Sequence, residues 1–581
     1  MFRVALIRCR EIDQTSDSAR NEEVLVSYAA AALEQAGICA RVYDFCLDAA
    51  LTTQALVSYH PKLAVVVVRR PGENLYSCTE FVRKLKNEEG WVGHITLFGH
   101  SLNGFEDALR RSPLDSVVLG EEPDLIRLAM AVESGAEIAS VSGLAYVDPQ
   151  TDRVVANAPS PFPNLDVLPF PKHYYLEELQ NRGRPTNHLK ATIQTSRGCY
   201  GRCRFCYLQA NRQLGFRYPW RGRSPEKVVD EIEMLSTSFG VRDFLFYDAN
   251  FFGPGQEGRA RAQAIATGII RRGLNIGFAA YARPDNLDRD TVRLMKQAGL
   301  VKLFMGVESF SQAVLDRYQK DVAVEHTLAA IELCKTLDIF MHLSFITYDY
   351  DTTLSEIREN IAGLNRCMRT KSHLFQSSEF LHNVLVPIAG TPIAQEYLDR
   401  GLISASSSNA VCGGGYAVCA NEQCPLYADK IYEFSDPVVA AIAETTRCIA
   451  AQIRTKSNEV YEHLTEATRQ YLTQADAKSR KNTEMLLRWR FDLPWFALSL
   501  IEEVVEGLAV SPEPATQKTT AVEEAIASLS QFNMHHLSSD SIDFGDQASP
   551  LLIIRTLGGE GVGGLILDQQ ERLTGGVAPH G

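Results

Sequence analysis

The chain has 581 residues, of which 45% are hydrophobic and 22% charged, and its formal net charge is −13. This composition is typical of a globular protein with room for roughly three or four domains, and the acidic balance disfavours a general nucleic-acid-binding or anionic-membrane-binding surface. No apolar run is long enough to span a bilayer, and the thirteen scattered cysteines do not resemble a secreted disulfide framework. We therefore expect a cytoplasmic protein with neither a nucleic-acid nor a membrane partner.

Residues 1–135 alternate short apolar runs with amphipathic stretches. A helix pattern covers Val24–Ala36, and the candidate strands are Val4–Ile7, Cys39–Phe45, Leu63–Val68, His94–Gly99 and Asp115–Gly120. This alternation predicts an α/β fold with a doubly wound, Rossmann-like parallel sheet. Such sheets bind ligands beyond the carboxyl ends of their strands, where the candidate loops are Arg69–Leu75, Gly99–Gly104 and Gly120–Asp124.

Residues 136–189 are rich in Pro, Asn and Asp, as in the phrase APSPFPNLDVLPFP. We predict a linker here, because prolines and turn-forming residues interrupt long regular elements.

The stretch Thr195–Tyr207 reads TSRGCYGRCRFCY and holds Cys199, Cys203 and Cys206 in a C-x3-C-x2-C pattern. Three thiolates this close suit a cubic four-iron cluster and leave its fourth iron without a protein ligand. The alternatives are a zinc knuckle or three free thiols. Zinc usually takes four ligands, and no fourth Cys or His follows at short spacing.

The segment 190–400 begins with the candidate strand Ala191–Ser196 and then alternates helices with strands. The helix patterns are Pro225–Ser236, Arg259–Arg272, Asp288–Ala298 and Val324–Leu337, and each precedes a strand pattern: Asp243–Phe252, Ile276–Asp285, Leu300–Ser309 and Ile339–Asp349. A sixth strand is expected near His382–Leu385. In parallel arrangements functional residues gather at the carboxyl strand ends, where the candidates are Asp248, Asn250, Arg283, Asp285, Glu308 and Ser309. Each could instead cap the helix that follows.

Residues 401–510 are predicted to be mostly helical, with patterns over Val438–Ile453 and Thr483–Leu508. This region contains Cys412, Cys419 and Cys424, for which we weigh an auxiliary cluster against a substrate-covering loop or surface thiols. Residues 511–581 are expected to be a flexible linker and a small tail. The phrase GGEGVGG in this tail lacks the lysine and hydroxyl residue of a phosphate-binding loop.

The loop Thr195–Tyr207, with Phe205 before its third cysteine, closely resembles the cluster loop of the radical S-adenosylmethionine (radical SAM) superfamily. GVES (Gly306–Ser309) and PIAGTP (Pro387–Pro392) are similar to phrases of that family. The resemblance implies a partial (β/α)6 barrel at 190–400 and an electron donor such as flavodoxin or ferredoxin. It also implies a [4Fe-4S] cluster on Cys199, Cys203 and Cys206, with S-adenosylmethionine near Phe205, Asp248, Asn250, Arg283, Glu308 and Ser309.

GHSLNGFEDAL (Gly99–Leu109) and VVLGEEPDL (Val117–Leu125) are similar to turns of the cobalamin-binding domain that precedes the radical SAM core in one large subgroup. This resemblance implies cobalamin near Gly99, His100, Ser101, Gly120 and Glu121. The histidine motif D-x-H-x-x-G is missing, so cobalamin would bind without a histidine below the cobalt. The implied activity is a class B-like methylase that moves a methyl group through cobalamin to an unactivated carbon of a small natural-product precursor.

Four other interpretations stay open. The N-terminal fold could have lost its cofactor, or the enzyme could form or rearrange rings without transferring a methyl group. A transfer-RNA methylthiotransferase is a further alternative, because Cys9, Cys46 and Cys78 loosely match the placement of that family's N-terminal cysteines, although their surroundings do not. A non-catalytic binding protein is disfavoured by the intact cluster loop.

Overall fold

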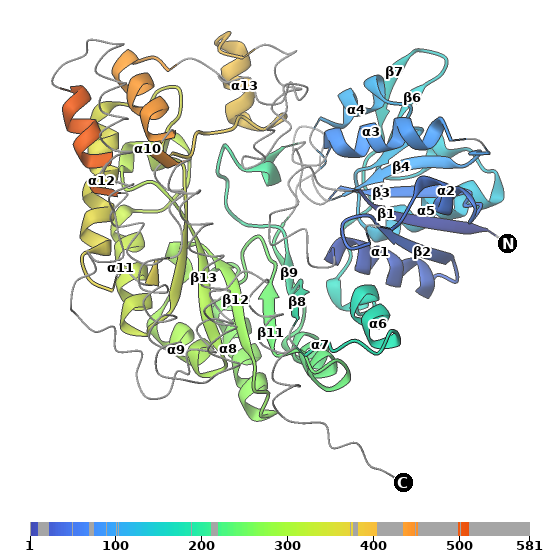
Figure 1. The fold of residues 1–581 in the computed structure, drawn as a ribbon, viewed down its shortest axis with the longest axis horizontal. Coiled ribbons are helices and arrows are strands. Elements are labelled where there is room, and N and C mark those ends of the chain that lie inside the picture. Colours follow the sequence, from blue (N-terminus) through green and yellow to red (C-terminus); the bar gives the residue numbers. More distant parts are fainter. Residues whose placement is uncertain are drawn as a thin grey trace.

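The computed structural model describes residues 2–9, 23–48, 50–68, 75–88, 90–99, 102, 104–187, 189–210, 219–371, 374–375, 382–403, 434–447, 449–450, 498–499 and 501–509. The described residues form two large, mainly parallel sheets, each with its own helices, which lie side by side (Figure 1), and one short antiparallel strand pair. The expected α/β class is confirmed.

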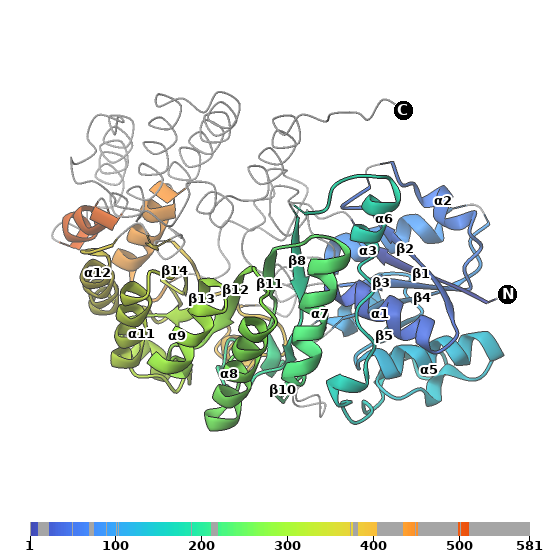
Figure 2. The same cartoon turned by 90° about the horizontal axis from the view of Figure 1, so that it is seen from below.

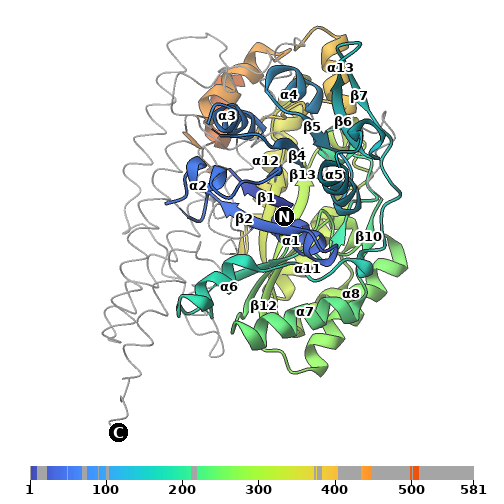
Figure 3. The same ribbon diagram turned by 90° about the vertical axis from the view of Figure 1, so that its right-hand side faces the viewer.

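The N-terminal sheet has the strand order β2-β1-β3-β4-β5-β6-β7. Its first five strands are mutually parallel, as predicted, and are β1 (Arg3–Arg8), β2 (Cys39–Asp44), β3 (Leu63–Val67), β4 (His94–Phe98) and β5 (Ser116–Val118). One face packs against α1 (Val24–Gln35) and α5 (Glu122–Ser134). The other packs against α2 (Thr53–Val57), α3 (Leu75–Lys86) and α4 (Phe105–Arg111) (Figure 3). Strand β3 is buried at every residue, because helices cover both faces.

The N-terminal sheet extends into the segment that we expected to be a linker. Here β6 (Leu144–Asp148) pairs antiparallel with β5, and β7 (Arg153–Ala156) pairs antiparallel with β6. The hairpin turns at Asp148, whose two carboxylate oxygens accept hydrogen bonds from the backbone N–H of Gln150 and the hydroxyl of Thr151, each at 2.8 Å. Such Asp-centred bonds mimic a backbone turn. The proline-rich stretch follows this hairpin and leads to α6 (Tyr174–Asn181).

The second sheet has five parallel strands in the order β14-β13-β12-β11-β8. They are β8 (Lys190–Ile193), β11 (Asp243–Phe246), β12 (Gly277–Ala282), β13 (Leu300–Glu308) and β14 (Phe340–Phe345). Helices line one side of this sheet (Figure 2). The helices of this part of the chain are α7 (Pro225–Ser238), α8 (Gly255–Arg271), α9 (Arg289–Gln297), α10 (Gln312–Arg317), α11 (Val324–Thr336), α12 (Leu354–Met368) and α13 (Pro392–Asp399).

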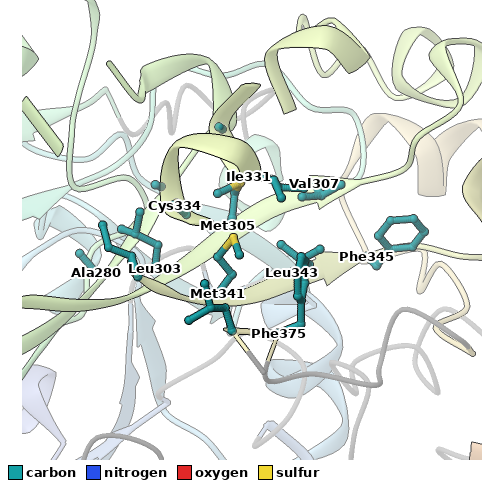
Figure 4. Packing of buried hydrophobic residues seen from close by; sticks show 14 of the residues in the cluster. Ala280, Leu303, Met305, Val307, Ile331, Cys334, Met341, Leu343, Phe345 and Phe375 are labelled. Atoms are coloured by element: carbon teal, nitrogen blue, oxygen red, sulfur yellow. The ribbon is translucent and has the colours of Figure 1, made fainter. Parts of the chain in front are cut away.

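Alternate residues of these strands face the helices and form the main core. Figure 4 shows Met305 of β13 and Met341 of β14 packed beside Ile331 of α11. Burial alternates residue by residue along β12 and β14, with every second side chain fully covered. Since successive strand residues point to opposite faces, the intervening side chains of β12, β13 and β14 lie on the face away from the helices.

The prediction of a sixth strand near His382–Leu385 is wrong. Among the described residues, this segment makes only a single bridge, between Val384 and Tyr348, and the sheet has five strands. The backbone N–H groups of Thr347 and Tyr348 both donate to the carbonyl of Asn383, at 2.8 and 3.0 Å. The chain therefore touches the end of β14 without running beside it, and Pro387 then has no N–H to continue a ladder.

Parts of the predicted C-terminal helices are present, since residues 437–447 and 501–509 are helical. Cys412, Cys419 and Cys424 lie outside the described residues, as does the whole segment 511–581. Within the described part of the chain, no helix has both the length and the apolarity needed to cross a bilayer.

Candidate active site

The three-cysteine loop follows the carboxyl end of β8. It is entered through β9 (Ser196–Arg197), which pairs antiparallel with β10 (Arg221–Gly222). Cys203 is buried, whereas Cys199 and Cys206 are half-buried and pack against the core of the N-terminal sheet. Burial raises the pKa of Cys203, and it raises the pKa of Cys206 to about 12, so these thiols stay protonated until a metal displaces their protons.

Two hydrogen-bond donors already point at the cysteine sulfurs. The backbone N–H of Gly201 donates to Cys199 Sγ at 3.4 Å, and Arg283 Nη1 donates to Cys203 Sγ at 3.7 Å. A Cβ at position 201 would lie 2.9 Å from Arg283 Nη1, so a side chain there would push the guanidinium from its present position. Hydrogen bonds to sulfur are one of the means by which proteins set the potential of an iron–sulfur cluster.

The loop suits a multi-iron cluster better than a single ion. No group of three or more His, Cys, Asp or Glu side chains in the described residues is arranged to hold one metal ion. A single zinc draws all its ligands to about 2.3 Å from one point, whereas a cubic cluster spreads its thiolates over different irons. Three thiols with N–H groups aimed at two of them are a donor set that fits a [4Fe-4S] cluster.

Asp248 anchors the start of the cluster loop. Its Oδ1 accepts hydrogen bonds from the backbone N–H of Thr195 and Ser196, both at 2.7 Å, and its Oδ2 accepts from Thr195 Oγ1 at 2.6 Å. Burial raises the pKa of Asp248, against these hydrogen bonds and the positive charge of Arg261. Both carboxylate oxygens are therefore engaged within the protein. This favours a structural role over direct contact with S-adenosylmethionine, although the role is to hold the cluster loop and not to cap the following helix, whose N-cap residue is Pro254.

Asp248→Asn is expected to lower the free energy of unfolding by about 1–3 kcal/mol and to reduce iron incorporation. The amide nitrogen cannot accept the Thr195 hydroxyl bond, and the negative charge near buried Arg261 is lost. Urea unfolding and iron analysis would measure both effects, with exposed Asp290→Asn as the control. Unchanged stability together with weaker binding of S-adenosylmethionine would show that Asp248 is a ligand contact instead.

Asn250 and Asn286 connect the cluster loop to the next two strands. Asn286 Oδ1 accepts hydrogen bonds from Tyr200 of the loop at 2.9 Å and from Asn250 Nδ2 at 3.0 Å. The fully buried Oδ1 of Asn250 has no hydrogen-bond partner among the described residues. A buried acceptor without a partner is costly, so this oxygen is available to a ligand that carries a donor.

Glu308 stands at the carboxyl end of β13 in the left-handed conformation, with φ +67°. Its Oε1 accepts a 2.8 Å hydrogen bond from Lys320 Nζ, and both side chains are buried. The Lys320 carbonyl in turn accepts from Arg283 Nη2 at 2.8 Å. Non-glycine residues held at positive φ are enriched at functional sites, and the contact of Glu308 with S-adenosylmethionine stays a prediction.

The guanidinium of Arg283 lies beside Cys203 and stays positively charged. Burial lowers the pKa of Arg283, but the charge and hydrogen bonds of Asp285 outweigh this effect, and the net pKa is raised. The guanidinium also lies over the Tyr200 ring at 5.3 Å. Arg283 was expected from the sequence as a contact of S-adenosylmethionine, and the structure places it against the cluster-binding sulfur.

Two other predicted residues have partners outside this centre. Ser309 Oγ donates to Asn360 of α12 at 2.7 Å and accepts from the backbone N–H of Ser311 at 3.0 Å. Ser309 is therefore engaged within the protein, mainly with distant Asn360, and it is not the N-cap residue of α10, which is Ser311. The Phe205 ring packs edge-on against Tyr318, with ring centroids 5.4 Å apart.

Three of the residues expected to bind cobalamin, Gly99, Gly120 and Glu121, lie in the described part of the chain. A Cβ on Gly99 would lie 2.5 Å from the carbonyl oxygen of Val68, and one on Gly120 would lie 1.9 Å from Asp124 Oδ2. Both glycines are therefore required by internal packing. Glu121 is buried and ion-paired. His100 and Ser101 lie outside the described residues.

Sequence reasoning missed a buried ionic clamp between the N-terminal sheet and the cluster loop. Arg197 binds Glu122 through two hydrogen bonds of 2.7 and 2.8 Å and lies 3.1 Å from Glu121. Arg221 also pairs with Glu121. The clamp joins the strand that enters the cluster loop to the start of α5. Only the position of Arg197, two residues before Cys199, could have suggested it.

A cavity of about 320 Å³ opens at the carboxyl ends of β1 and β2, lined by Cys9, Phe45, Leu51, Thr52, Thr53, Phe81 and Lys84. Cys46 Sγ donates to the carbonyl of Cys9 at 3.0 Å, and burial, followed by a hydrogen bond with Cys78, raises the pKa of Cys9. The three cysteines that we compared with methylthiotransferases thus come together. They are not arranged as a single-metal site within the described residues.

Residues 193–362 match the radical SAM superfamily, and this segment runs from the end of β8 through the cluster loop and β14 into α12. This chain contains a radical SAM domain. The domain implies a [4Fe-4S] cluster and S-adenosylmethionine, and the matched segment contains Cys199, Cys203 and Cys206.

Curated relatives of the radical SAM chain include three kinds of enzyme. An uncharacterized methyltransferase of Pyrococcus horikoshii is 29% identical over 44% of this chain and 54% of its own length. The anaerobic magnesium-protoporphyrin IX monomethyl ester cyclase of Rubrivivax gelatinosus is 29% identical over 46% and 48%. The 4'-phospho-dehydrooxetanocin synthase of Priestia megaterium is 29% identical over 42% and 34%. The chain thus spans about half or less of the length of each of these relatives.

Two solved enzymes share the fold. The cobalamin-dependent radical enzyme OxsB, with aqua-cobalamin and S-adenosylmethionine bound, matches 100% of this chain and 82% of its own, at TM-score 0.67 and 17% identity. The methyltransferase TsrM of Kitasatospora setae, with cobalamin and a [4Fe-4S] cluster bound, matches 70% of this chain and 77% of its own, at TM-score 0.54 and 18% identity. This chain therefore shares its α/β fold with OxsB and TsrM.

Proposed function

We propose that this protein is a cobalamin-dependent radical SAM methyltransferase that acts on an unactivated carbon of a small molecule. In this proposal residues 190–400 form the catalytic core, and the N-terminal sheet is the cobalamin-binding unit. The observation that carries the proposal is the cluster loop at the carboxyl end of β8, packed against the N-terminal sheet through Cys199 and Cys206. This placement favours a single reaction space between the two sheets.

When bound, the cluster and S-adenosylmethionine supply a 5'-deoxyadenosyl radical after one-electron reduction by an external donor. The chain's own residues prepare the site for that chemistry. Arg283 and the Gly201 N–H lie against two of the cluster-binding sulfurs, and Lys320 adds a second cation near Cys203. Positive charge and N–H donors near the sulfurs favour the reduced cluster. The free Oδ1 acceptor of Asn250 is suited to a donor such as an ammonium group.

The more specific claims of the proposal are that the protein binds cobalamin and that it transfers a methyl group. They are supported by the shared fold of OxsB and TsrM and by the methyltransferase relative of Pyrococcus horikoshii. The contacts expected at Gly99, Gly120 and Glu121 stay a prediction, and no step is assigned to them.

Anaerobic incubation of the reconstituted full chain with methyl-labelled S-adenosylmethionine, a reductant and candidate precursors tests the function. We expect 5'-deoxyadenosine release together with transfer of the label to the substrate, because one molecule of S-adenosylmethionine would supply the methyl group and a second would supply the radical. Absorption spectra should show cobalamin bands beside the iron–sulfur shoulder. If the reconstituted protein retains no cobalamin, the methyltransferase proposal is abandoned, whereas deoxyadenosine release still identifies a radical SAM enzyme.

A ring-forming or rearranging reaction without methyl transfer is the second candidate. Three magnesium-protoporphyrin cyclases, 27% to 31% identical over 42% to 46% of this chain, favour it. Deoxyadenosine release with no label in the product would decide for this alternative. A methylthiotransferase has weaker support, because the related putative enzyme of Methanocaldococcus jannaschii is 25% identical over 47% of this chain.

A further inference from the structure

Within the described part of the chain, Arg283 is the one charged side chain that donates a hydrogen bond to a cysteine of the cluster loop. Its Nη1 lies 3.7 Å from Cys203 Sγ, whereas Cys199 Sγ accepts only from the neutral backbone N–H of Gly201. Arg283 directly follows β12 and is the N-cap residue of the short helical turn Pro284–Asn286. The end of the strand therefore fixes the backbone from which this side chain reaches the sulfur.

The orientation of the Arg283 guanidinium is set by contacts on its other sides. Nε and Nη2 donate to the two carboxylate oxygens of Asp285 at 3.0 and 3.2 Å, and Nη2 also donates to the Lys320 carbonyl at 2.8 Å. The guanidinium carbon lies 5.3 Å from the centre of the Tyr200 ring. Because the guanidinium is planar and rigid, these contacts leave Nη1 directed at Cys203. An arginine does not lose its proton in a protein, so the charge beside this sulfur is permanent.

Asp285 gives the cation beside Cys203 a counter-charge on its far side. Its carboxylate binds the edge formed by Nε and Nη2, whereas Nη1 faces the sulfur. The side chain of Arg283 is 8% exposed and that of Asp285 is 23% exposed, so the anion is the member of the pair that water screens more. Cys203 therefore meets the positive end of an oriented ion pair.

Reduction adds one electron, and hence one negative charge, to an iron–sulfur cluster. A cation close to a ligating sulfur stabilises that added charge, and an anion nearby destabilises it. Since the carboxylate of Asp285 is farther from the sulfur and better hydrated than the guanidinium, its effect should be opposite in sign and smaller.

We propose that Arg283 and Asp285 are positioning residues that set the reduction potential of the cluster in opposite directions, the guanidinium raising it and the carboxylate lowering it. This inference rests on the proposed radical function and names the residues that regulate how readily its site accepts an electron. The pair acts through the Cys203 sulfur and needs no contact with S-adenosylmethionine or substrate.

An anaerobic redox titration of the reconstituted full chain, without S-adenosylmethionine, tests the inference, with the reduced cluster followed by electron paramagnetic resonance. Arg283→Met should lower the ratio of reduced to oxidised cluster at a fixed potential about tenfold, which is about 59 mV for one electron. Asp285→Asn should raise that ratio about threefold, because it keeps the shape and removes the opposing charge. The double variant should lie between the two single variants. Arg283→Lys should stay closer to the wild type than Arg283→Met, because it keeps the charge.

A matched ion pair at the other end of β12 provides the control. Arg272 lies before the first residue of β12, and its Nη2 is 2.7 Å from Asp230 Oδ1 of α7. Arg272→Met and Asp230→Asn should leave the potential unchanged. Urea unfolding of every variant separates stability from potential, since a merely structural role would lower stability without giving shifts of opposite sign.

Three outcomes would overturn the inference: an unchanged potential in Arg283→Met, shifts in the same direction in Arg283→Met and Asp285→Asn, or an equal shift in Arg272→Met. If Arg283→Met keeps the wild-type potential but binds S-adenosylmethionine more weakly, Arg283 is a ligand contact and not a regulator of the cluster. The proposed function fails separately, through the absence of deoxyadenosine release from the wild-type protein, and the potential is measured without turnover.

Discussion

Replacement of Cys203 by alanine is expected to abolish 5'-deoxyadenosine formation and to reduce the iron content of the reconstituted protein to background. Cys203 is the buried member of the three cysteines and the one whose sulfur accepts a hydrogen bond from Arg283. Two thiolates cannot hold a cluster that needs three, and without the cluster no electron reaches S-adenosylmethionine. Iron and sulfide analysis and chromatography of the nucleoside product measure the effect.

Cys199→Ala and Cys206→Ala should behave in the same way, because each thiolate holds a different iron. Cys39 on the exposed side of β2 offers a matched control, and Cys39→Ala should keep full iron content and full deoxyadenosine release. Deoxyadenosine release that survives in any of the three loop variants would rule out the cluster assignment.

Most of the fold could be predicted because hydrophobic periodicity records burial directly. The fully buried run of β3 and the alternating burial of β12 and β14 are two different patterns, and each is read from the sequence without knowledge of distant residues. The β6–β7 hairpin was missed because its strands are short and lie before a proline-rich stretch. The predicted strand at His382–Leu385 failed because an apolar run reports burial and not pairing.

The candidate site was harder to predict, because polar side chains act through partners that are distant in sequence. Asp248 was expected as a ligand contact, yet its hydrogen-bond partner Thr195 lies 53 residues away. Ser309 is bound to Asn360 across 51 residues, and Glu121 is bound to Arg221 across 100. The positions of these residues after predicted strands correctly indicated that they lie at the edge of a sheet. Whether a polar group there faces a ligand or another part of the protein depends on the tertiary fold, which the local pattern does not contain.

Arg197→Met is expected to lower the free energy of unfolding by about 3–5 kcal/mol, because it leaves the fully buried Glu122 without its partner. The pKa of Arg197 is raised overall, since the charges of Glu122 and Glu121 outweigh the opposing effect of burial, and the guanidinium therefore stays charged in the clamp. Arg197→Lys should cost less, because it keeps the charge but loses the two-pronged geometry. Urea unfolding measured for each variant gives the comparison.

A second substitution, at Glu122, separates the effect of the Arg197 charge on stability from the effect of its packing. The double variant Arg197→Met with Glu122→Met should recover a large part of the stability lost by Arg197→Met, because no buried charge is then unpaired. If the clamp also aligns the cluster loop with the N-terminal sheet, Arg197→Met should lower the ratio of methyl transfer to deoxyadenosine release. The double variant should then regain stability while this ratio remains below that of the wild type. Arg182→Met, which breaks an exposed pair with Glu178, is the control and should change neither quantity. If the double variant has the wild-type ratio of methyl transfer to deoxyadenosine release, the clamp is only a stabilising contact. If the double variant is no more stable than Arg197→Met, the guanidinium acts through packing and not through its charge.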